Sequence, residues 1–339
     1  MKPNIIRMDI AKNVLQLHTV NPETGEIHRI KLRRDEVLPF FVHRAPPLVA
    51  LEACRSAHEW GRQLCSLGHE VGLLAPKSVR PFVLRNKTDA AAARAIWPAV
   101  QQPKTHFVAI KTEQQQTVLA LHRMREQLMK FRIMQTNALR GILYELGIAL
   151  PSGYPALATA WADAITSAAE RLSAVLIVSS QDQWASVQSR DKEIAALERR
   201  LTDSSRRTEQ CKELIKIPGV GPLTATAAVA TICDPATFSS GSQFAAWLGL
   251  VPRQAGTSGR VRQLGLSKRD DVYLHTLLMY GARAIISRSK HSPWIAELLK
   301  RRPYSVAVAA LANKLARPIW AVLFQHTPFG PEHSSGPSI

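Results

Sequence analysis

The chain has 339 residues, enough for two or three compact units, and its 46% hydrophobic content excludes an intrinsically disordered protein. Its 44 lysines and arginines against 26 acidic residues give a net charge of +18. This excess favours a polyanionic partner, because phosphates neutralised by basic side chains release counterions; the alternative is a basic surface that only keeps the protein soluble.

Cysteine usage and hydropathy indicate a cytoplasmic protein without a membrane segment. The four cysteines form no C-x-x-C pair and no zinc-finger spacing, so we expect reduced core residues. The N-terminus has no apolar signal region, and the longest apolar run, 310–324, is interrupted by Lys314 and Arg317.

The first third of the chain predicts a mixed α/β sheet. Apolar runs at 4–10, 14–20 and 26–32 indicate three short strands, with a turn before the third. A buried strand at 47–53, a helix at 56–68 and another strand at 70–75 follow.

From residue 113 the pattern becomes helical. One apolar seam has three- and four-residue steps typical of a coiled coil, and it comprises Leu121, Met124, Leu128, Phe131, Ala138 and Ile142. A second seam comprises Val187, Ile194, Leu197 and Leu201. These helices predict an arm or a dimerisation element, or else an ordinary helical hairpin packed on its own domain.

The last third, from about 206, is helical with one basic, glycine-rich interruption at 252–266. A helix is expected to start at Ser267, where Asp270 follows three residues later as in a capping box. The tail, 329–339, is polar, rich in proline and glycine, and predicted to be disordered.

Three acidic residues are candidate ligands of Mg²⁺. Asp9 interrupts the first strand, Glu52 ends the fourth, and Asp89 precedes four alanines in a helical segment. Carboxylates on two strand ends and a nearby helix can converge on a hard cation, although each alone is more commonly a salt-bridged residue. A fourth acid three residues after Asp89 would share its helical face, but this position holds Ala92.

Basic residues surround two further segments. The interruption at 252–266 and the residues after it combine hydroxyls and glycines with Arg253, Arg260, Arg262, Lys268 and Arg269, so it is either a phosphate-binding segment or a flexible loop that touches DNA backbone. Lys12, Arg85 and Lys87 lie close in sequence to the proposed acids, where they either orient a nucleic-acid strand or simply balance the acidic charge. Gly219 and Gly221 open a helix, either as half of a phosphate-binding helix-hairpin-helix or as a plain turn.

Seven motifs in order carry a family resemblance that spans residues 5–328. They are MDIAKNVLQLH, LEACRSAHEWGRQL, RNKTDAAAARAIWPAVQQP, IPGVGPLTATAAVA, FAAWLGLVPRQ, LSKRDDVYLHTLLMYGARA and RRPYSVAVAALANKLARPIWAVL. Together they closely resemble the DEDD transposases of bacterial insertion sequences, which are bridge-RNA- or seekRNA-guided recombinases related to the Piv invertase.

The resemblance implies an α/β RuvC-like, RNase H-fold domain (1–110), a coiled-coil dimerisation arm (111–205) and a mostly α-helical transposase domain (206–328). It also implies that Asp9, Glu52 and Asp89 match three metal-binding acids, with the fourth replaced by Ala92. That alanine was either introduced to block cleavage and trap a complex or arose in a naturally decayed copy of the gene. In both cases we expect DNA cleavage to be weakened or lost. A nucleophilic serine falls on Ser258, or on Thr257 when counted from Pro252.

The partners implied by the resemblance are a guide noncoding RNA, donor and target DNA, and further copies of the chain in a dimer or tetramer. Such an enzyme would act at the bacterial nucleoid. Two alternatives stay open: a Piv-like site-specific DNA invertase without guide RNA, and a non-catalytic nucleic-acid-binding remnant.

Overall fold

The computed structural model describes residues 5–20, 26–44, 48–82, 100, 107–257, 260–267, 271–288 and 292–330. The chain divides into two compact units. Unit 1 comprises Met1–Gln116 and Ile232–Ser239, and unit 2 comprises Thr117–Thr231 and Ser240–Ile339. A short loop from the later part of the chain therefore belongs to the N-terminal unit.

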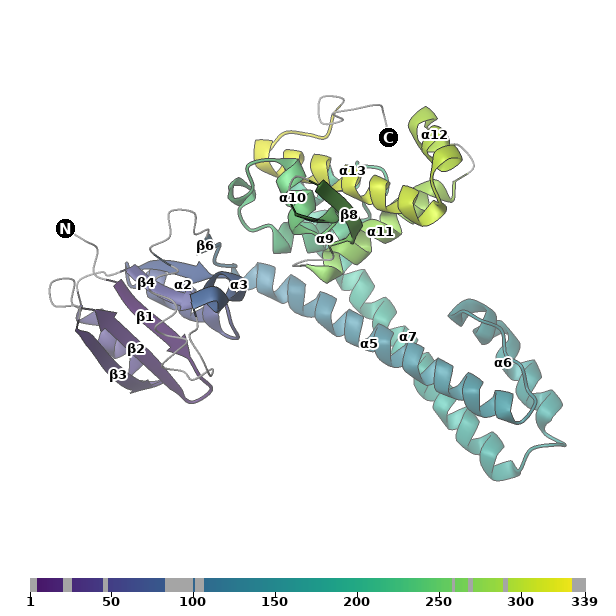
Figure 1. The fold of residues 1–339 in the computed structure, drawn as a ribbon. Helices are drawn as coiled ribbons and strands as arrows, with labels where there is room; N and C mark the ends of the chain where they lie inside the picture. Colours follow the sequence, from purple (N-terminus) through teal and green to yellow (C-terminus); the bar gives the residue numbers. More distant parts are fainter. Residues whose placement is uncertain are drawn as a thin grey trace. The chain divides into compact units, whose positions relative to one another are not determined.

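A six-stranded mixed sheet forms the centre of unit 1 (Figure 1). Its order is β3-β2-β1-β4-β5-β6, with β1, β4 and β5 parallel and β2, β3 and β6 completing antiparallel pairs. The strands are β1 (Ile5–Ile10), β2 (Val14–Val20), β3 (Ile27–Arg33), β4 (Leu48–Glu52), β5 (Glu70–Leu74) and β6 (Phe107–Val108). The predicted mixed α/β sheet is confirmed, with the first five strands displaced by no more than a residue or so.

Both faces of this sheet are covered. One face buries Met8 and Leu51 together with Phe41 of α1 (Val37–Val42) and Trp60 of α2 (Ala57–Ser66). A smaller apolar cluster on the other face includes Ala50 and elements α3 (Pro76–Val79) and η1 (Arg80–Phe82). Because side chains alternate along a strand, neighbouring residues of β1 and β4 serve different faces.

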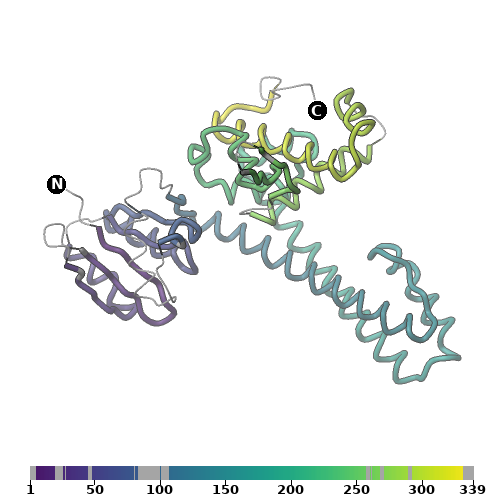
Figure 2. Tube along the Cα trace, viewed as in Figure 1, coloured from purple at the N-terminus to yellow at the C-terminus, as the bar shows by residue number. Residues whose placement is uncertain are grey.

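Two long helices in unit 2, α5 (Glu113–Glu145) and α7 (Ala174–Arg207), run antiparallel, with α6 (Tyr154–Ala168) packed at their far end (Figures 1 and 2). Arg125 and Arg132 of α5 form ion pairs with Glu198 and Asp191 of α7. At the far end Trp161 stacks on Trp184, with ring centroids 4.7 Å apart.

The two predicted helical seams have different outcomes. All four residues of the second seam are buried, as expected. Three residues of the first seam, Met124, Phe131 and Ile142, are 53%, 40% and 50% exposed, so this seam is not buried within its own chain. The face of α5 that packs on neighbouring helices contains polar residues instead. They are the ion-paired Arg125 and Arg132 and the buried His122 and Thr136, which a search for apolar periodicity does not find.

The remaining helices of unit 2 are α8 (Glu209–Ile215), α9 (Pro222–Thr231), α10 (Gly241–Trp247), α11 (Val272–Ile286), α12 (Pro293–Arg301) and α13 (Tyr304–Gln325). Helices α8, α10, α11 and α12 contact α13, whereas α9 contacts α7, α8 and α11. Among the described residues α13 alone is long and apolar enough to cross a membrane, but its inner face is the core of this helical cluster.

Three local expectations need correction. Residues 252–266 form a β-hairpin of β7 (Pro252–Thr257) and β8 (Arg260–Leu266), which excludes an irregular loop. The following helix does not start at Ser267: Asp271 is its N-cap and accepts a bond from the Leu274 amide at 2.8 Å, while the Ser267 amide closes the base of the hairpin. All four cysteines are free, and Cys211 is buried as expected, but Cys54 and Cys65 are exposed.

Candidate functional site

Asp9 and Glu52 lie at the carboxyl ends of adjacent parallel strands. Met8 of β1 is in register with Leu51 of β4, so the next residue on each strand is the acid. Both acids point to the face opposite Met8 and Leu51, and both are half-buried. The structure therefore places two of the three predicted acids side by side at one edge of the sheet.

The Cys54 thiol lies near the two acids. Its pKa is raised first by burial and then by the negative charges of Glu52 and Asp9. Because both carboxylates act on one thiol, Asp9 and Glu52 lie close to Cys54 and to each other. Cys54 follows Glu52 by two residues, and no motif predicted that it belongs to this centre.

A buried positive charge lies beneath the acid pair. Arg7 precedes Asp9 by two residues on β1, faces the same way and is 1% exposed. Burial lowers its pKa to about 10, so the guanidinium still carries its charge at neutral pH. Arg7 therefore places a buried positive charge on the same face of β1 as Asp9.

Basic groups also flank the end of β1. Lys12 is exposed in the β1–β2 turn, and its carbonyl accepts a bond from Arg34 Nη1 at 3.1 Å. Arg34 in turn lies over the Trp60 ring, 5.3 Å from its centroid. Lys12 thus lies where it was predicted, and Arg34 adds a charge that sequence spacing did not suggest.

The remaining proposed members of this centre, Asp89, Ala92, Arg85 and Lys87, lie outside the described residues. Within the described ranges no group of three or more His, Cys, Asp and Glu side chains has the geometry of a metal site. Asp9 and Glu52 offer oxygen ligands of the kind that Mg²⁺ prefers, so they fit part of such a site.

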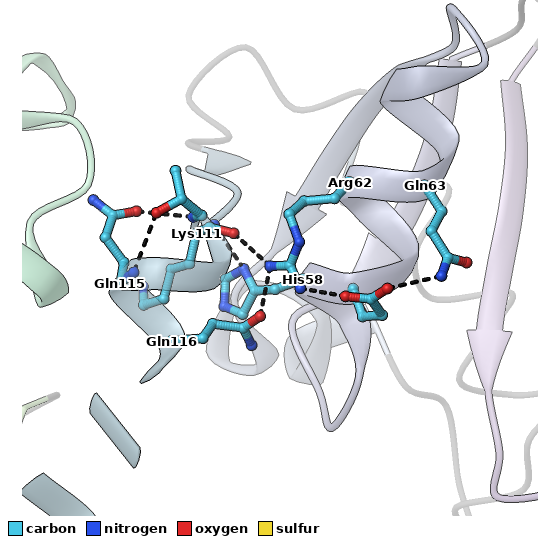
Figure 3. A network of polar contacts seen from close by, with 8 residues as sticks. His58, Arg62, Gln63, Lys111, Gln115 and Gln116 are labelled. Carbon is cyan, nitrogen blue, oxygen red and sulfur yellow. Dashed lines mark hydrogen bonds and ion pairs between the residues drawn. The ribbon is translucent and has the colours of Figure 1, made fainter. Parts of the chain in front are cut away.

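A polar network holds the segment 107–116 to α2 in unit 1 (Figure 3). Arg62 donates to the Lys111 carbonyl at 2.6 Å and to Gln116 Oε1 at 2.5 Å, and it also pairs with Glu59. The Lys111 amide donates to His58 Nδ1 at 3.2 Å. The first turn of α5 is therefore fixed to the sheet unit.

The second centre is the hairpin in unit 2. Arg253, Arg260 and Arg262 are exposed on it. Thr257 ends β7, while Ser258, Gly259, Lys268 and Arg269 lie outside the described residues. The structure thus places three of the predicted basic residues on one ribbon, in the unit that does not contain Asp9 and Glu52.

The glycine turn before α9 has a packing explanation. Gly219 has a φ of +81°, and a Cβ there would lie 2.6 Å from Ile285 Cδ1. A Cβ on Gly281 of α11 would lie 2.2 Å from the Gly219 carbonyl oxygen. Both glycines are required by the close approach of this turn to α11. Gly221 has open space around it, so the same constraint does not apply there.

Comparison with known proteins covers both centres. Residues 211–300 match the Transposase IS116/IS110/IS902 family. A probable family 20 transposase of Pseudomonas aeruginosa is 40% identical over 96% of this chain and 98% of its own length. The transposases for insertion sequence elements IS1328 of Yersinia enterocolitica and IS1111A of Coxiella burnetii are each 34% identical, over 96% and 94% of this chain and 99% and 89% of their own lengths. The chain belongs to the IS116/IS110/IS902 family of transposases.

The transposase carries its basic hairpin and glycine turn inside the matched family segment. Its acid pair lies outside that segment, but it falls within the nearly full-length similarity to the relatives. The predicted resemblance to insertion-sequence transposases is confirmed, and DNA is the expected substrate of such an enzyme.

Proposed function

We propose that this transposase is an RNA-guided DNA recombinase that cuts and rejoins strands through Mg²⁺ and a serine. The observation that supports this most is the pairing of Asp9 and Glu52 at the carboxyl ends of two parallel strands. The antiparallel β1–β3 meander followed by β4, α2 and β5 is consistent with a RuvC-like, RNase H-fold domain.

In this proposal Asp9 and Glu52 hold the cation from the sheet, and Asp89 approaches from the chain that follows. A bound Mg²⁺ would stabilise the leaving oxygen and lower the pKa of the attacking hydroxyl.

The hydroxyl of Ser258, with Thr257 as the alternative, attacks the phosphorus of a DNA phosphodiester. One bond forms between the side-chain oxygen and phosphorus, and one bond breaks between phosphorus and a deoxyribose oxygen, which leaves with a proton. The exposed arginines of the hairpin neutralise the phosphates beside the reacting one. Attack by a hydroxyl of the other DNA reverses the step and completes the exchange.

A homo-oligomer is part of the proposal, because such an exchange needs two cuts. The exposed seam of α5 runs beside a groove of about 350 Å³ lined by residues of α5 and α7, namely Met124, Gln127, Leu128, Glu193, Ala196, Leu197 and Arg200. An apolar helix face that its own chain leaves exposed suits a second copy of the same helix. The coiled-coil arm would then be the dimerisation element.

Ala92 favours a second function, a nucleic-acid-binding protein with little or no cleavage. With Ala92 in place of the fourth acid, the proposed cation site has one ligand fewer. Under this alternative the protein still binds RNA and DNA at the nucleoid, and the net charge of +18 serves binding alone.

A recombination assay with Ala92→Asp tests the proposal. The purified protein, with and without its co-purified RNA, is incubated with plasmids that carry the ends of the insertion sequence and its target. We expect stoichiometric RNA, and recombination that requires both this RNA and the restored aspartate. Recombination without RNA would indicate a Piv-like invertase, and none under any condition would support the binding-only function.

A further inference from the structure

The β7–β8 ribbon is exposed on both of its faces. Every described side chain from 252 to 256 and from 262 to 265 is exposed, and so is Arg260. Across the described chain the two strands pack on each other and contact other elements only slightly. An isolated two-stranded hairpin is marginally stable in water, so we expect a binding partner to cover this ribbon.

The base of the ribbon is firmly held. Leu248 and Leu250, just before β7, are buried. The Leu248 carbonyl contacts His275 Nδ1 of α11 at 2.9 Å, and the Leu250 carbonyl accepts from Asn313 Nδ2 of α13 at 3.1 Å. The Ser267 amide donates to the Val251 carbonyl at 3.0 Å. The ribbon therefore projects from a fixed platform of two core helices.

The strand register separates the side chains onto two faces. Ala255 is opposite Arg262, and Thr257 is opposite Arg260, so these arginines share one face and have small residues as partners. Gln254 is opposite Gln263 on the other face. That face therefore presents a cross-strand pair of amides and no ionised group among its described positions.

Glycines flank the glutamine pair. By alternation Gly256 shares its face. Gly265 instead lies at the register shift between the Gln254–Gln263 and Pro252–Leu266 pairs, where alternation is interrupted, and a glycine within a strand often marks such a β-bulge. A Cβ on Gly265 would meet nothing within 4 Å.

We propose that the β7–β8 ribbon enters the major groove of the DNA substrate and reads base edges through Gln254 and Gln263. The B-form major groove admits a two-stranded ribbon, and a glutamine amide forms two hydrogen bonds to the adenine edge. The long side chains of Arg260 and Arg262 reach the phosphates that border the groove. Double-stranded RNA is a poorer fit, because its major groove is deep and narrow.

This inference deepens the proposed function, but it depends only on DNA being the substrate. It does not need the serine, the metal or the guide RNA. Binding can therefore fail while covalent chemistry is observed, and the reverse can also occur. The intact protein is used throughout, with a duplex DNA library randomised at its centre as the probe and a double-stranded RNA of matched length beside it.

Two variants separate the roles of the two faces. Gln254→Ala with Gln263→Ala should reduce discrimination at one or two base pairs by about tenfold or more, with an unchanged salt dependence. Arg260→Ala with Arg262→Ala should weaken binding to all sequences and lower the slope of log K against log salt by about 2.

The matched control is Gln181→Ala with Gln188→Ala, two exposed glutamines of α7 that should leave both measurements unchanged. Unaltered base preference in the ribbon glutamine variant, or an unchanged salt slope in the ribbon arginine variant, would overturn the proposal. Stronger retention of the RNA duplex than of the DNA by the wild type, lost in the ribbon variants, would do the same.

Discussion

His122 connects three helices of unit 2 through hydrogen bonds whose direction can be derived. Thr226 of α9 donates its hydroxyl hydrogen to the Pro222 carbonyl at 2.7 Å, so its oxygen accepts from His122 Nε2 at 3.0 Å. His122 Nδ1 must then accept from the hydroxyl of Tyr273 on α11, 2.9 Å away. The His122 imidazole is therefore neutral, with its proton on Nε2.

Stability should depend on pH through this residue. Burial, with a smaller contribution from Arg125, lowers the pKa of His122 from 6.5 to about 4. The unfolded chain takes up the proton near pH 6.5 and the folded chain only near 4, so stability is complete above 6.5 and is lost as pH falls between these values. The expected loss is about 3 kcal/mol in the free energy of unfolding.

Chemical denaturation at pH 7 and pH 4.5 measures this loss. His122→Gln keeps an amide in place of the imidazole and cannot take up a proton. The variant should be less stable than the wild type at pH 7, yet lose less stability on acidification. Equal losses in the two proteins would show that His122 is not responsible.

At the scale of elements, the exposed seam of α5 gives a direct prediction. Met124→Glu with Phe131→Glu should convert a dimer into a monomer, because a charge buried at each position has no partner across the interface. Light scattering across a range of concentrations measures the mass. Asn137→Glu, exposed on another side of α5, should remain dimeric. An unchanged mass in the double variant would exclude this seam as the interface.

The sequence predicts some elements well because local pattern and packing agree in them. The strands of unit 1 alternate or form continuous apolar runs, and the parallel pairing of β4 with β5 follows from the β4–α2–β5 order. The parallel pairing of β1 with β4 is a long-range contact that the local pattern does not predict. That pairing is enough to bring Asp9 and Glu52 together. The buried seam of α7 was equally clear, since Val187, Ile194, Leu197 and Leu201 are all apolar.

The ribbon and the inner face of α5 could not be predicted in the same way. The ribbon strands PRQAGT and RVRQLGL contain glycines and few β-branched residues, and neither strand has an apolar face. The inner face of α5 uses His122, Arg125, Arg132 and Thr136, whose burial depends on partners far away in the chain. Local periodicity contains no information about such partners.

At the scale of the whole molecule, the candidate catalytic residues are divided between the two units. The acid pair belongs to the sheet of unit 1, and the basic ribbon with the candidate hydroxyls belongs to unit 2. A reaction that needs both a cation and a nucleophile must bring them together on DNA, within one chain or between copies. The net charge of +18 favours assembly on nucleic acid.

Trapping of a covalent protein-DNA adduct tests the central claim most directly. Ala92→Asp is incubated with duplex DNA, RNA and Mg²⁺, and adducts are resolved on a denaturing gel. We predict an adduct in this background that disappears when Thr257→Ala and Ser258→Ala are added together, or when Asp9→Asn is added, or when Mg²⁺ is chelated. An adduct that persists with both hydroxyls removed, or that forms equally well without Asp9, would contradict the account.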